Sequence, residues 1–205
     1  MRNIFYQIPK RLLDFVLGCL LLLLSTPLIL IACLAIRLES PGNPFFIQDR
    51  IGLKGKPFKL IKLRGMYVDA RKRYSNLYQY DESKGLNFYF HNHGDPRVTK
   101  VGSFIRSCSI DELPNFINVI FGSMSLVGPR PEIPEVMSLY GEYRDEYLSV
   151  KPGITCMSKC TGRDSLTKYE SIQLDLIYVK NKSFITDLSI LWKTFLSVVS
   201  RKNVY

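Results

Sequence analysis

An apolar run from Leu12 to Ile36 limits most strongly how this chain can fold, because Asp14 is its only charged residue. As one straight helix, the run would reach about 37 Å, which is enough to cross a hydrocarbon layer roughly 30 Å thick. A secretory signal peptide would end in a small-residue cleavage site, and the residues that follow Ala35 offer none. We therefore expect a membrane segment that stays on the mature protein.

Two features of this segment indicate that it does not cross the membrane. Pro27 lies near its middle, where a proline removes a backbone hydrogen bond, and the hydroxyls of Ser25 and Thr26 can satisfy the freed groups. Basic residues stand on both sides, namely Arg2, Lys10 and Arg11 before the run and Arg37, Arg50, Lys54, Lys56, Lys59 and Lys62 after it. This distribution favours keeping both ends in the cytoplasm. We expect a re-entrant helix, break, helix hairpin at Ser25-Thr26-Pro27, with a kinked helix that crosses once as the alternative.

The remainder of the chain predicts an α+β fold that is mostly helical. We expect a membrane-inserted segment over residues 1–40 and one cytoplasmic domain over residues 41–205. Short strands are expected at 45–48 and 58–64, where aromatic and β-branched residues follow turn signals, and a loop at 74–95. Helical periodicity predicts helices over 113–121, with Gly122 after its end, and through 172–178. The basic, amphipathic residues 188–199 predict a helix that lies in the membrane interface or packs on the domain.

The charge balance points to an anionic partner, since the formal net charge is +10. Between Arg50 and Arg73 there are nine Lys or Arg residues and one acidic residue, Asp69. Next to a membrane segment such a run favours anionic inner-leaflet lipids as partners, with a solvated basic face as the alternative. A nucleic-acid binder is disfavoured because the chain contains no recognisable binding module. The sequence leaves a homo-oligomer open.

Asp111 and Glu112 are the first candidates for chemistry, because they stand together at an expected helix start in this basic chain. Ser109 and Glu112 fit a capping box, but Pro114 favours a later start with Asp111 as the N-cap. There the helix dipole and Arg106 should keep Asp111 ionised, while the adjacent like charge should raise the pKa of Glu112. Two carboxylates with separated pKa values can divide the work of nucleophile and general acid or metal ligand.

Three arginines stand beside turn residues or the acidic pair, where guanidinium groups can hold phosphate oxygens: Arg106, Arg130 and Arg163. A hard cation such as Mg²⁺ suits carboxylate and pyrophosphate oxygens together, with Asp111 and Glu112 as its protein ligands. The chain has neither a GxxxxGK[ST] loop nor a GxGxxG turn. A bound nucleotide would therefore not be held by a P-loop or Rossmann site.

Many ordered motifs resemble those of the monotopic bacterial phosphoglycosyl transferases, also called bacterial sugar transferases. The resemblance runs from Lys10 to about Val199 and includes the proline-broken membrane segment. The motifs that carry it are Lys10-Arg11 with Asp14, Phe46-x-Gln48-x-Arg50-x-Gly52, Lys62 to Met66, Asp95-Pro96-Arg97, Arg106 to Leu113, Asn118-Val119, Met124 to Pro131, Lys151 to Thr155, Gly162-Arg163, and Asp175 before Tyr178 to Asn181.

The resemblance implies a small catalytic domain resting on the cytoplasmic side of the bacterial inner membrane, in a surface-glycan pathway. It would transfer a phosphosugar from a UDP-sugar to undecaprenyl phosphate and release UMP. Asp111 matches the residue that forms a covalent phosphosugar intermediate, Glu112 matches its partner, and Mg²⁺ assists. Phosphate-binding roles are expected for Arg97, Arg106, Arg130 and Arg163, and supporting roles for Gln48, Arg50, Lys62, Lys159 and Asp175.

Two segments depart from the family's pattern. Gly65 stands where the family usually has threonine, and the usual Gly-Ile-Thr-Gly-Trp-Ala-Gln-Val run reads Gly153-Ile154-Thr155-Cys156-Met157-Ser158-Lys159-Cys160. Lys159 in place of glutamine suggests altered recognition of the donor. These departures motivate an alternative, a non-catalytic membrane scaffold that keeps the fold and has lost donor binding.

Overall fold

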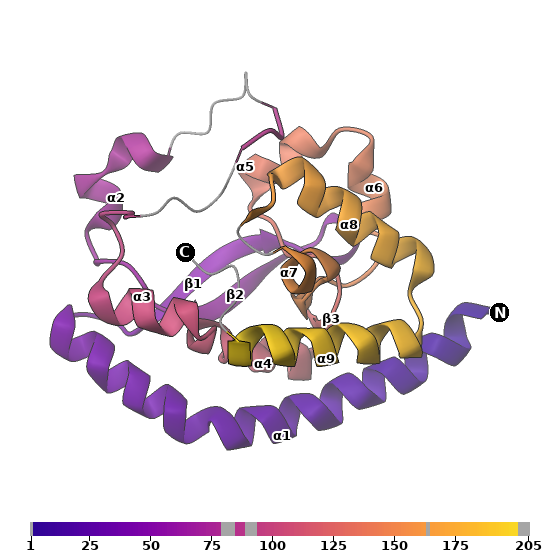
Figure 1. Cartoon of the computed structure of the whole chain (residues 1–205), viewed down its shortest axis with the longest axis horizontal. Coiled ribbons are helices and arrows are strands. Elements are labelled where there is room, and N and C mark those ends of the chain that lie inside the picture. Colours follow the sequence, from indigo (N-terminus) through magenta and orange to yellow (C-terminus); the bar gives the residue numbers. More distant parts are fainter. Residues whose placement is uncertain (1, 79–84, 89–93, 163–164, 201–205) are drawn as a thin grey trace.

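The long N-terminal helix α1 (Arg2–Glu39) lies along one side of the molecule in the computed structural model, which describes residues 2–78, 85–88, 94–162 and 165–200. Figure 1 shows α1 as one bowed ribbon whose convex side faces away from the other elements. The expected hairpin at Pro27 is not confirmed, because the helix continues through this proline. The Ser25 and Thr26 hydroxyls both donate to the Leu22 carbonyl, at 3.1 and 2.8 Å, within the turn that precedes Pro27. A bent helix can therefore absorb the missing N–H without a break.

The first turns of α1 are fastened to the rest of the domain by polar contacts. Tyr6 and Lys10 donate to the buried carboxylate of Asp187, each at 2.8 Å. Asp14, also buried, accepts a hydrogen bond from the Leu126 N–H at 3.0 Å. Arg11 donates to two backbone carbonyls at the end of α4 (Asn115–Phe121), both at 2.6 Å.

The last turn of α1 is fastened to the same domain. Glu39 accepts hydrogen bonds from the N–H groups of Lys100 and Val101, each at 2.8 Å, which begin α3 (Lys100–Ser107). The buried Arg64 guanidinium donates to the Ser40 carbonyl just after the helix. Both ends of α1 therefore contact one folded unit.

Two short sheets support the centre of the molecule. Strands β1 (Phe45–Ile51) and β2 (Pro57–Leu63) form an antiparallel hairpin that confirms the expected strands, with the 3₁₀ turn η1 (Leu53–Gly55) between them. Strands β3 (Ser125–Val127) and β4 (Gly153–Thr155) pair in parallel and were not expected from the sequence. The backbones of Gly128 and Gly153 approach so closely that a Cβ on Gly153 would lie 2.1 Å from the Gly128 nitrogen.

Helices and turns surround these sheets. The expected helices over 113–121, 172–178 and 188–199 are confirmed as α4, α8 (Lys168–Asn181) and α9 (Phe184–Ser200), and Gly122 follows α4 with φ +83°. The shorter elements are α2 (Ala70–Arg73), η2 (Ser75–Tyr78), η4 (Ile110–Glu112), α5 (Pro134–Met137), η5 (Ser138–Tyr140), α6 (Tyr143–Tyr147) and α7 (Met157–Thr161).

The mostly helical α+β class is thus confirmed, and the division at residue 40 stays a prediction. Of the expected loop at 74–95, residues 79–84 and 89–93 lie outside the described residues.

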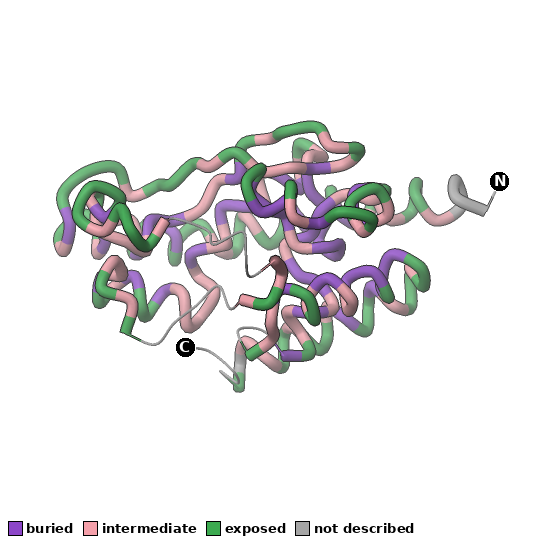
Figure 2. The backbone as a smooth tube through the Cα atoms, turned by 90° about the horizontal axis from the view of Figure 1, so that it is seen from above, coloured by how far each residue is buried: buried purple, intermediate pink, exposed green. Residues whose placement is uncertain are grey.

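Apolar burial holds these layers together (Figure 2). One cluster joins β2, α4, β3, α8 and α9 through residues such as Leu60, Val119 and Ile190. A second joins the short helices α5 and α6 to α8, and a third packs the inner face of α1 against β2 and α3. Fully burying one such side chain stabilises the fold by about 1.5–3 kcal/mol.

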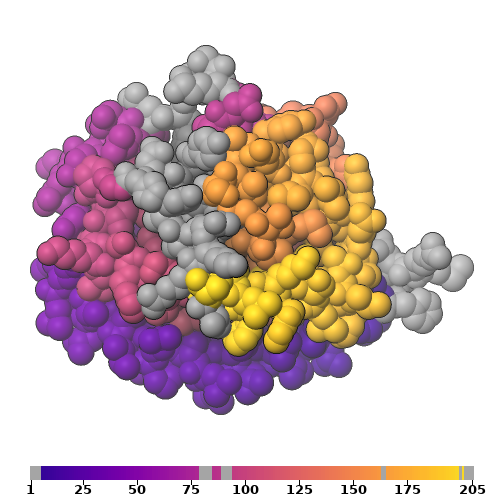
Figure 3. Space-filling view, viewed as in Figure 1, coloured from indigo at the N-terminus to yellow at the C-terminus, as the bar shows by residue number. Residues whose placement is uncertain are grey.

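Large apolar side chains are also left exposed, mainly along α1 and α9. Figure 3 shows α9 on one face of the molecule, and Tyr6 and Lys10 of α1 contact Asp187 near the start of α9. The inner face of α9 buries Asp187 and Ile190, whereas its outer face exposes a stripe of Ile185, Leu188, Trp192, Phe195 and Leu196. Packing of α9 on the domain, one of its two expected placements, is therefore confirmed. A membrane-interface position for its outer stripe stays a prediction.

Candidate active site

The acidic pair lies in the turn η4 between α3 and α4. Ser109 precedes this turn with a left-handed φ of 56°, and its side chain makes no cap hydrogen bond, so the alternative capping box is not formed. Helix α4 begins only at Asn115, after Pro114, so the expectation that Asp111 is the N-cap is wrong. The two carboxylates are therefore available for contacts with side chains from other elements.

Glu112 is paired with cations that arrive from distant parts of the chain. Its Oε2 atom contacts the Nζ atom of Lys159 on α7, and its Oε1 atom lies 3.9 Å from Nη1 of Arg130. Burial alone would raise the pKa of Glu112, but Lys159 and Arg130 lower this pKa to about 2. Glu112 is thus an anion at neutral pH.

Asp111 has the opposite shift. Its side chain is buried, and both burial and the Glu112 charge raise its pKa, against the lowering influence of Lys62, Lys159 and Arg106. The expected order of the two pKa values is therefore reversed. The sequence showed only the adjacent like charge, whereas the fold brings Lys159 and Arg130 onto Glu112 and shields Asp111 from water.

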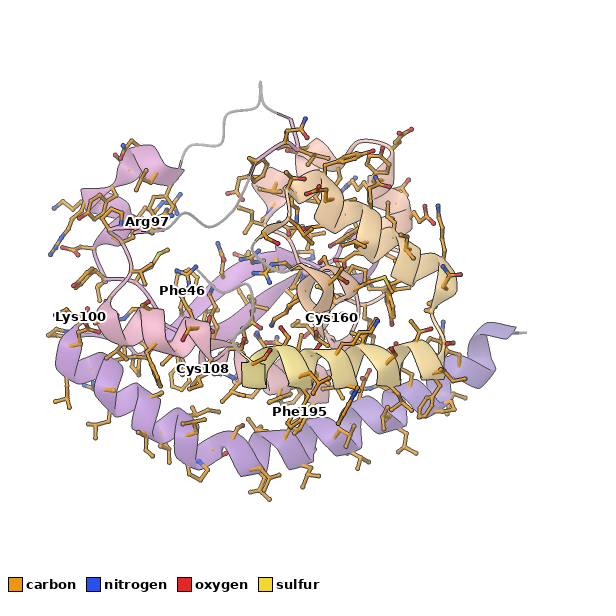
Figure 4. The ribbon with its side chains drawn as sticks, in the orientation of Figure 1. Phe46, Arg97, Lys100, Cys108, Cys160 and Phe195 are labelled. Carbon is orange, nitrogen blue, oxygen red and sulfur yellow. The ribbon has the colours of Figure 1, made fainter. Side chains whose placement is uncertain are left out.

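Lys62 is a third titrating group in the site. It stands on β2 opposite Phe46 on β1, with its Nζ atom 5.6 Å from the centre of the Phe46 ring. Burial lowers the pKa of Lys62 to about 8, the Asp111 carboxylate opposes this shift, and Arg50, Arg106 and Arg130 add to it. Figure 4 shows Phe46 projecting from the hairpin on the side that faces the middle of the molecule.

Asp175 positions two segments of the site at once. Its buried carboxylate accepts hydrogen bonds from the backbone N–H groups of Arg130 and Ser158 and from the Tyr147 hydroxyl, each at 3.0 Å. The Tyr147 hydroxyl also lies 3.0 Å from the Arg130 carbonyl. Asp175 therefore supports the turn that carries Arg130 and the helix that carries Lys159.

The β1 residues expected to support the site hold the same turn from the other side. Arg50 donates to the Pro131 carbonyl at 3.0 Å, and its second nitrogen donates to the Gln48 side chain at 2.8 Å. Gln48 thus orients Arg50, and Arg50 positions the turn. Their supporting roles in the chemistry stay predictions.

The remaining arginines differ in their surroundings. Arg106 lies against Gly65, where an added Cβ would be 3.1 Å from the Arg106 Cδ atom, so the glycine that departs from the family pattern leaves room for this side chain. Arg97 forms an ion pair with Asp95 at 2.7 Å and lies over the Tyr78 ring. Figure 4 places Arg97 at the α2 end of the molecule, away from Cys160 on α7, so its role toward phosphate stays a prediction. Arg163 lies outside the described residues.

Asp111 and Glu112 could supply the few protein ligands that a Mg²⁺ ion needs. Among the described residues, no group of three or more His, Cys, Asp and Glu side chains is arranged to hold a metal. Mg²⁺ is commonly bound by one or two carboxylates together with substrate phosphates and waters. The pair fits that arrangement when a diphosphate supplies further oxygens.

Sequence reasoning placed Lys159 toward the donor and missed its ion pair with Glu112. The available signal was a single lysine in the run from Cys156 to Cys160, which otherwise holds small or apolar residues. It also missed the buried ion pair between Lys168 and Glu132, which joins α8 to the segment after Arg130. Neither pair has a local sequence pattern, because 47 and 36 residues separate the partners.

The structure combines a long apolar helix with a domain in which an acidic pair lies among several basic side chains. Such a site is suited to anionic substrates. The sequence model of the bacterial sugar transferases matches residues 5–201, and the chain belongs to this family.

Named relatives are similar over almost the whole chain. It is 38% identical to a UDP-glucose:undecaprenyl-phosphate glucose-1-phosphate transferase of Caulobacter vibrioides, covering 97% of this chain and 73% of that protein. It is 39% identical to an Escherichia coli protein of the same name, covering 97% and 42%. An uncharacterized sugar transferase of Haemophilus influenzae is 37% identical, again with 42% of its length covered. The chain thus spans less than half of some relatives.

Proposed function

We propose that the chain is a phosphoglycosyl transferase that moves a phosphosugar from a UDP-sugar to undecaprenyl phosphate. Membership of the sugar transferase family and the names of the relatives support this reaction class. The observation that carries the proposal is the buried Asp111, which lies beside an ionised Glu112 and within the field of Lys62 and Arg106. A shielded carboxylate among fixed cations suits attack on a phosphoryl group.

In the proposed first step, an Asp111 oxygen attacks the β-phosphorus of the donor. An aspartyl–phosphorus bond forms, and the bond from that phosphorus to the oxygen bridging the two phosphates breaks, so UMP leaves with the electron pair. In the second step, a phosphate oxygen of undecaprenyl phosphate attacks the same phosphorus and releases Asp111. Lys62, Arg106 and Lys159 favour the ionised nucleophile against the effect of burial.

Glu112 has a different proposed role. A carboxyl with a pKa of about 2 is ionised at neutral pH, so Glu112 acts as a fixed anion between Lys159 and Arg130 rather than as a general acid. Mg²⁺, when bound, would be held by Asp111 and Glu112 with donor oxygens and would neutralise phosphoryl charge.

We further propose that α1 enters and leaves the same leaflet of the bacterial inner membrane, with the domain on the cytoplasmic side. The helix is long and apolar enough to cross a membrane by length and composition. A crossing helix would separate its two ends by the bilayer, yet Lys10 and Glu39 both contact one domain. Anionic inner-leaflet lipids would then be neighbours of the domain. The continuous helix supports a bent, side-on insertion.

The test is UMP release from a panel of UDP-sugars with undecaprenyl phosphate. Asp111→Asn should abolish release, because an amide cannot form the acyl phosphate, and mass spectrometry of the wild type with donor alone should detect a phosphosugar adduct on Asp111. Asp49→Asn, in an exposed ion pair with Lys59, is the matched control and should keep full activity. Release undiminished in Asp111→Asn would overturn the nucleophile. A wild type inactive with every donor would favour the scaffold alternative.

A further inference from the structure

We propose that Lys159 is a positioning residue that anchors the Glu112 carboxylate and compensates its charge, so that Asp111 is left as the reacting carboxylate. This inference rests on the proposed phosphosugar transfer. It assigns the lysine that departs from the family pattern to the acidic pair instead of to the donor. The Lys159 ammonium thus supplies a positive charge in contact with the acidic pair.

Lys159 is held rigidly enough for this role. Its Nζ atom contacts Oε2 of Glu112 and lies 3.4 Å from the Ile154 carbonyl, and 9% of the side chain is exposed. Helix α7 is itself fixed, because the Ser158 N–H donates to Asp175 and the helix packs on α8 and α9. A lysine with so little side-chain freedom loses little entropy when it forms the ion pair.

The same geometry argues against a direct contact between Lys159 and the donor. Two of the three ammonium donors are directed at protein oxygens, and the side chain is nearly enclosed. Arg130, by contrast, exposes 41% of its side chain and lies 3.9 Å from Glu112. Arg130 is therefore the better placed of the two to reach a donor phosphate while Lys159 serves the carboxylate.

Removal of the ammonium would change the charge around the nucleophile. Glu112 would keep the longer contact to Arg130, and its charge would act on the adjacent, buried Asp111 with less compensation. The Glu112 side chain would also lose the contact that fixes its Oε2 atom beside the nucleophile. Glutamine at this position could donate a hydrogen bond but would supply no charge.

The first experiment separates positioning from donor recognition. Lys159→Gln and Lys159→Met should each lower kcat for UMP release about tenfold or more, since breaking a buried ion pair leaves an uncompensated charge. The donor KM and the inhibition constant of UMP should stay within about twofold. Lys159→Arg should keep kcat within about threefold because it restores the charge. Lys59→Gln, which removes an exposed lysine, is the matched control and should keep wild-type activity.

The second experiment tests whether Lys159 acts through Glu112. In a Glu112→Gln background, measured with enzyme in excess over donor so that slow rates are readable, Lys159→Gln should cause no further loss. Thermal unfolding of each variant reports folding separately. An additive loss, a raised donor KM with unchanged kcat, or a folded Lys159→Arg as slow as Lys159→Gln would each overturn the inference. If the wild type and Lys159→Gln were both fully active, the inference about Lys159 would be overturned and the proposed function would stand. If the wild type were inactive, both the inference and the proposed function would be overturned.

Discussion

Lys62 illustrates how the fold changes the chemistry of a single residue. Its pKa is lowered to about 8 by burial and by the charges of Arg50, Arg106 and Arg130, against the opposing influence of the Asp111 carboxylate. Lys62 is therefore charged below about pH 8 and neutral above it. Because the charged form favours ionised Asp111, the proposed reaction depends on its protonation.

We expect UMP release to fall as the pH rises through about 8, and we expect Lys62→Arg to move this fall to higher pH, because a guanidinium stays charged. The measurement is a pH profile of kcat for both proteins, with Lys59→Arg on the exposed face of the hairpin as the control. A profile that is the same with arginine at position 62 would show that another group causes the decline.

The acidic pair shows what could be predicted about single residues. The expected helix start and the ordered motifs around it predict Asp111 and Glu112 as the acidic pair of the site. The order of their pKa values could not be predicted, because Lys159 and Arg130 reach Glu112 through the tertiary fold. A sequence shows adjacent charges. It does not show which distant cation lies against which carboxylate.

Among the elements, those with a strong local pattern were predictable and those held by distant contacts were not. The hairpin strands β1 and β2 and the helices α4, α8 and α9 follow from turn residues and periodicity. Strands β3 and β4 have three residues each, and their pairing depends on two glycines that let the backbones meet. The break expected at Pro27 is not confirmed, because one missing N–H can bend a helix without ending it.

Glu39 links two elements, since its carboxylate accepts the first N–H groups of α3 from the end of α1. Partial burial would raise its pKa, but the hydrogen bonds from Val101, Thr99 and Lys100 lower it below the ordinary value of 4.5. With a lowered folded pKa, the stabilisation is present above pH 4.5 and is lost as the pH falls through the folded value.

Glu39→Gln should therefore lower the free energy of unfolding by about 1 kcal/mol at pH 7, a typical cost for losing a helix cap. The difference from wild type should shrink as the pH falls below 4.5. Denaturant unfolding in detergent micelles at several pH values measures this effect, with the exposed Glu135→Gln as the control. A difference that is constant with pH would contradict the ionic cap.

At the scale of the whole molecule, α9 and α1 both expose large apolar side chains, and those of α9 form the stripe described above. Trp192 exposes 62% of its surface and stacks on Phe195, with ring centres 5.8 Å apart. The periodicity of residues 188–199 predicted this helix. The sequence could not decide between its two expected placements, because packing on the domain depends on contacts such as that of Asp187 with Tyr6, 181 residues away.

We expect Trp192→Glu to weaken binding to liposomes that contain anionic lipid about tenfold or more, because it places a charge in the apolar stripe. Leu77→Glu, an equally drastic change at an exposed position on η2, should leave binding unchanged. Flotation of both variants with liposomes gives the comparison. Equal binding of the two would place α9 away from the lipid.

The attachment of both ends of α1 to one domain also restricts how the protein reaches its bilayer. A helix tied at Lys10 and at Glu39 cannot thread into lipid end first while those contacts persist. In the proposed insertion, the bent helix enters the leaflet side-on, and the folded domain reaches the membrane surface in the same event. Such an arrival adds area to a single leaflet, so we expect it to proceed fastest where that leaflet is loosely packed or convexly curved.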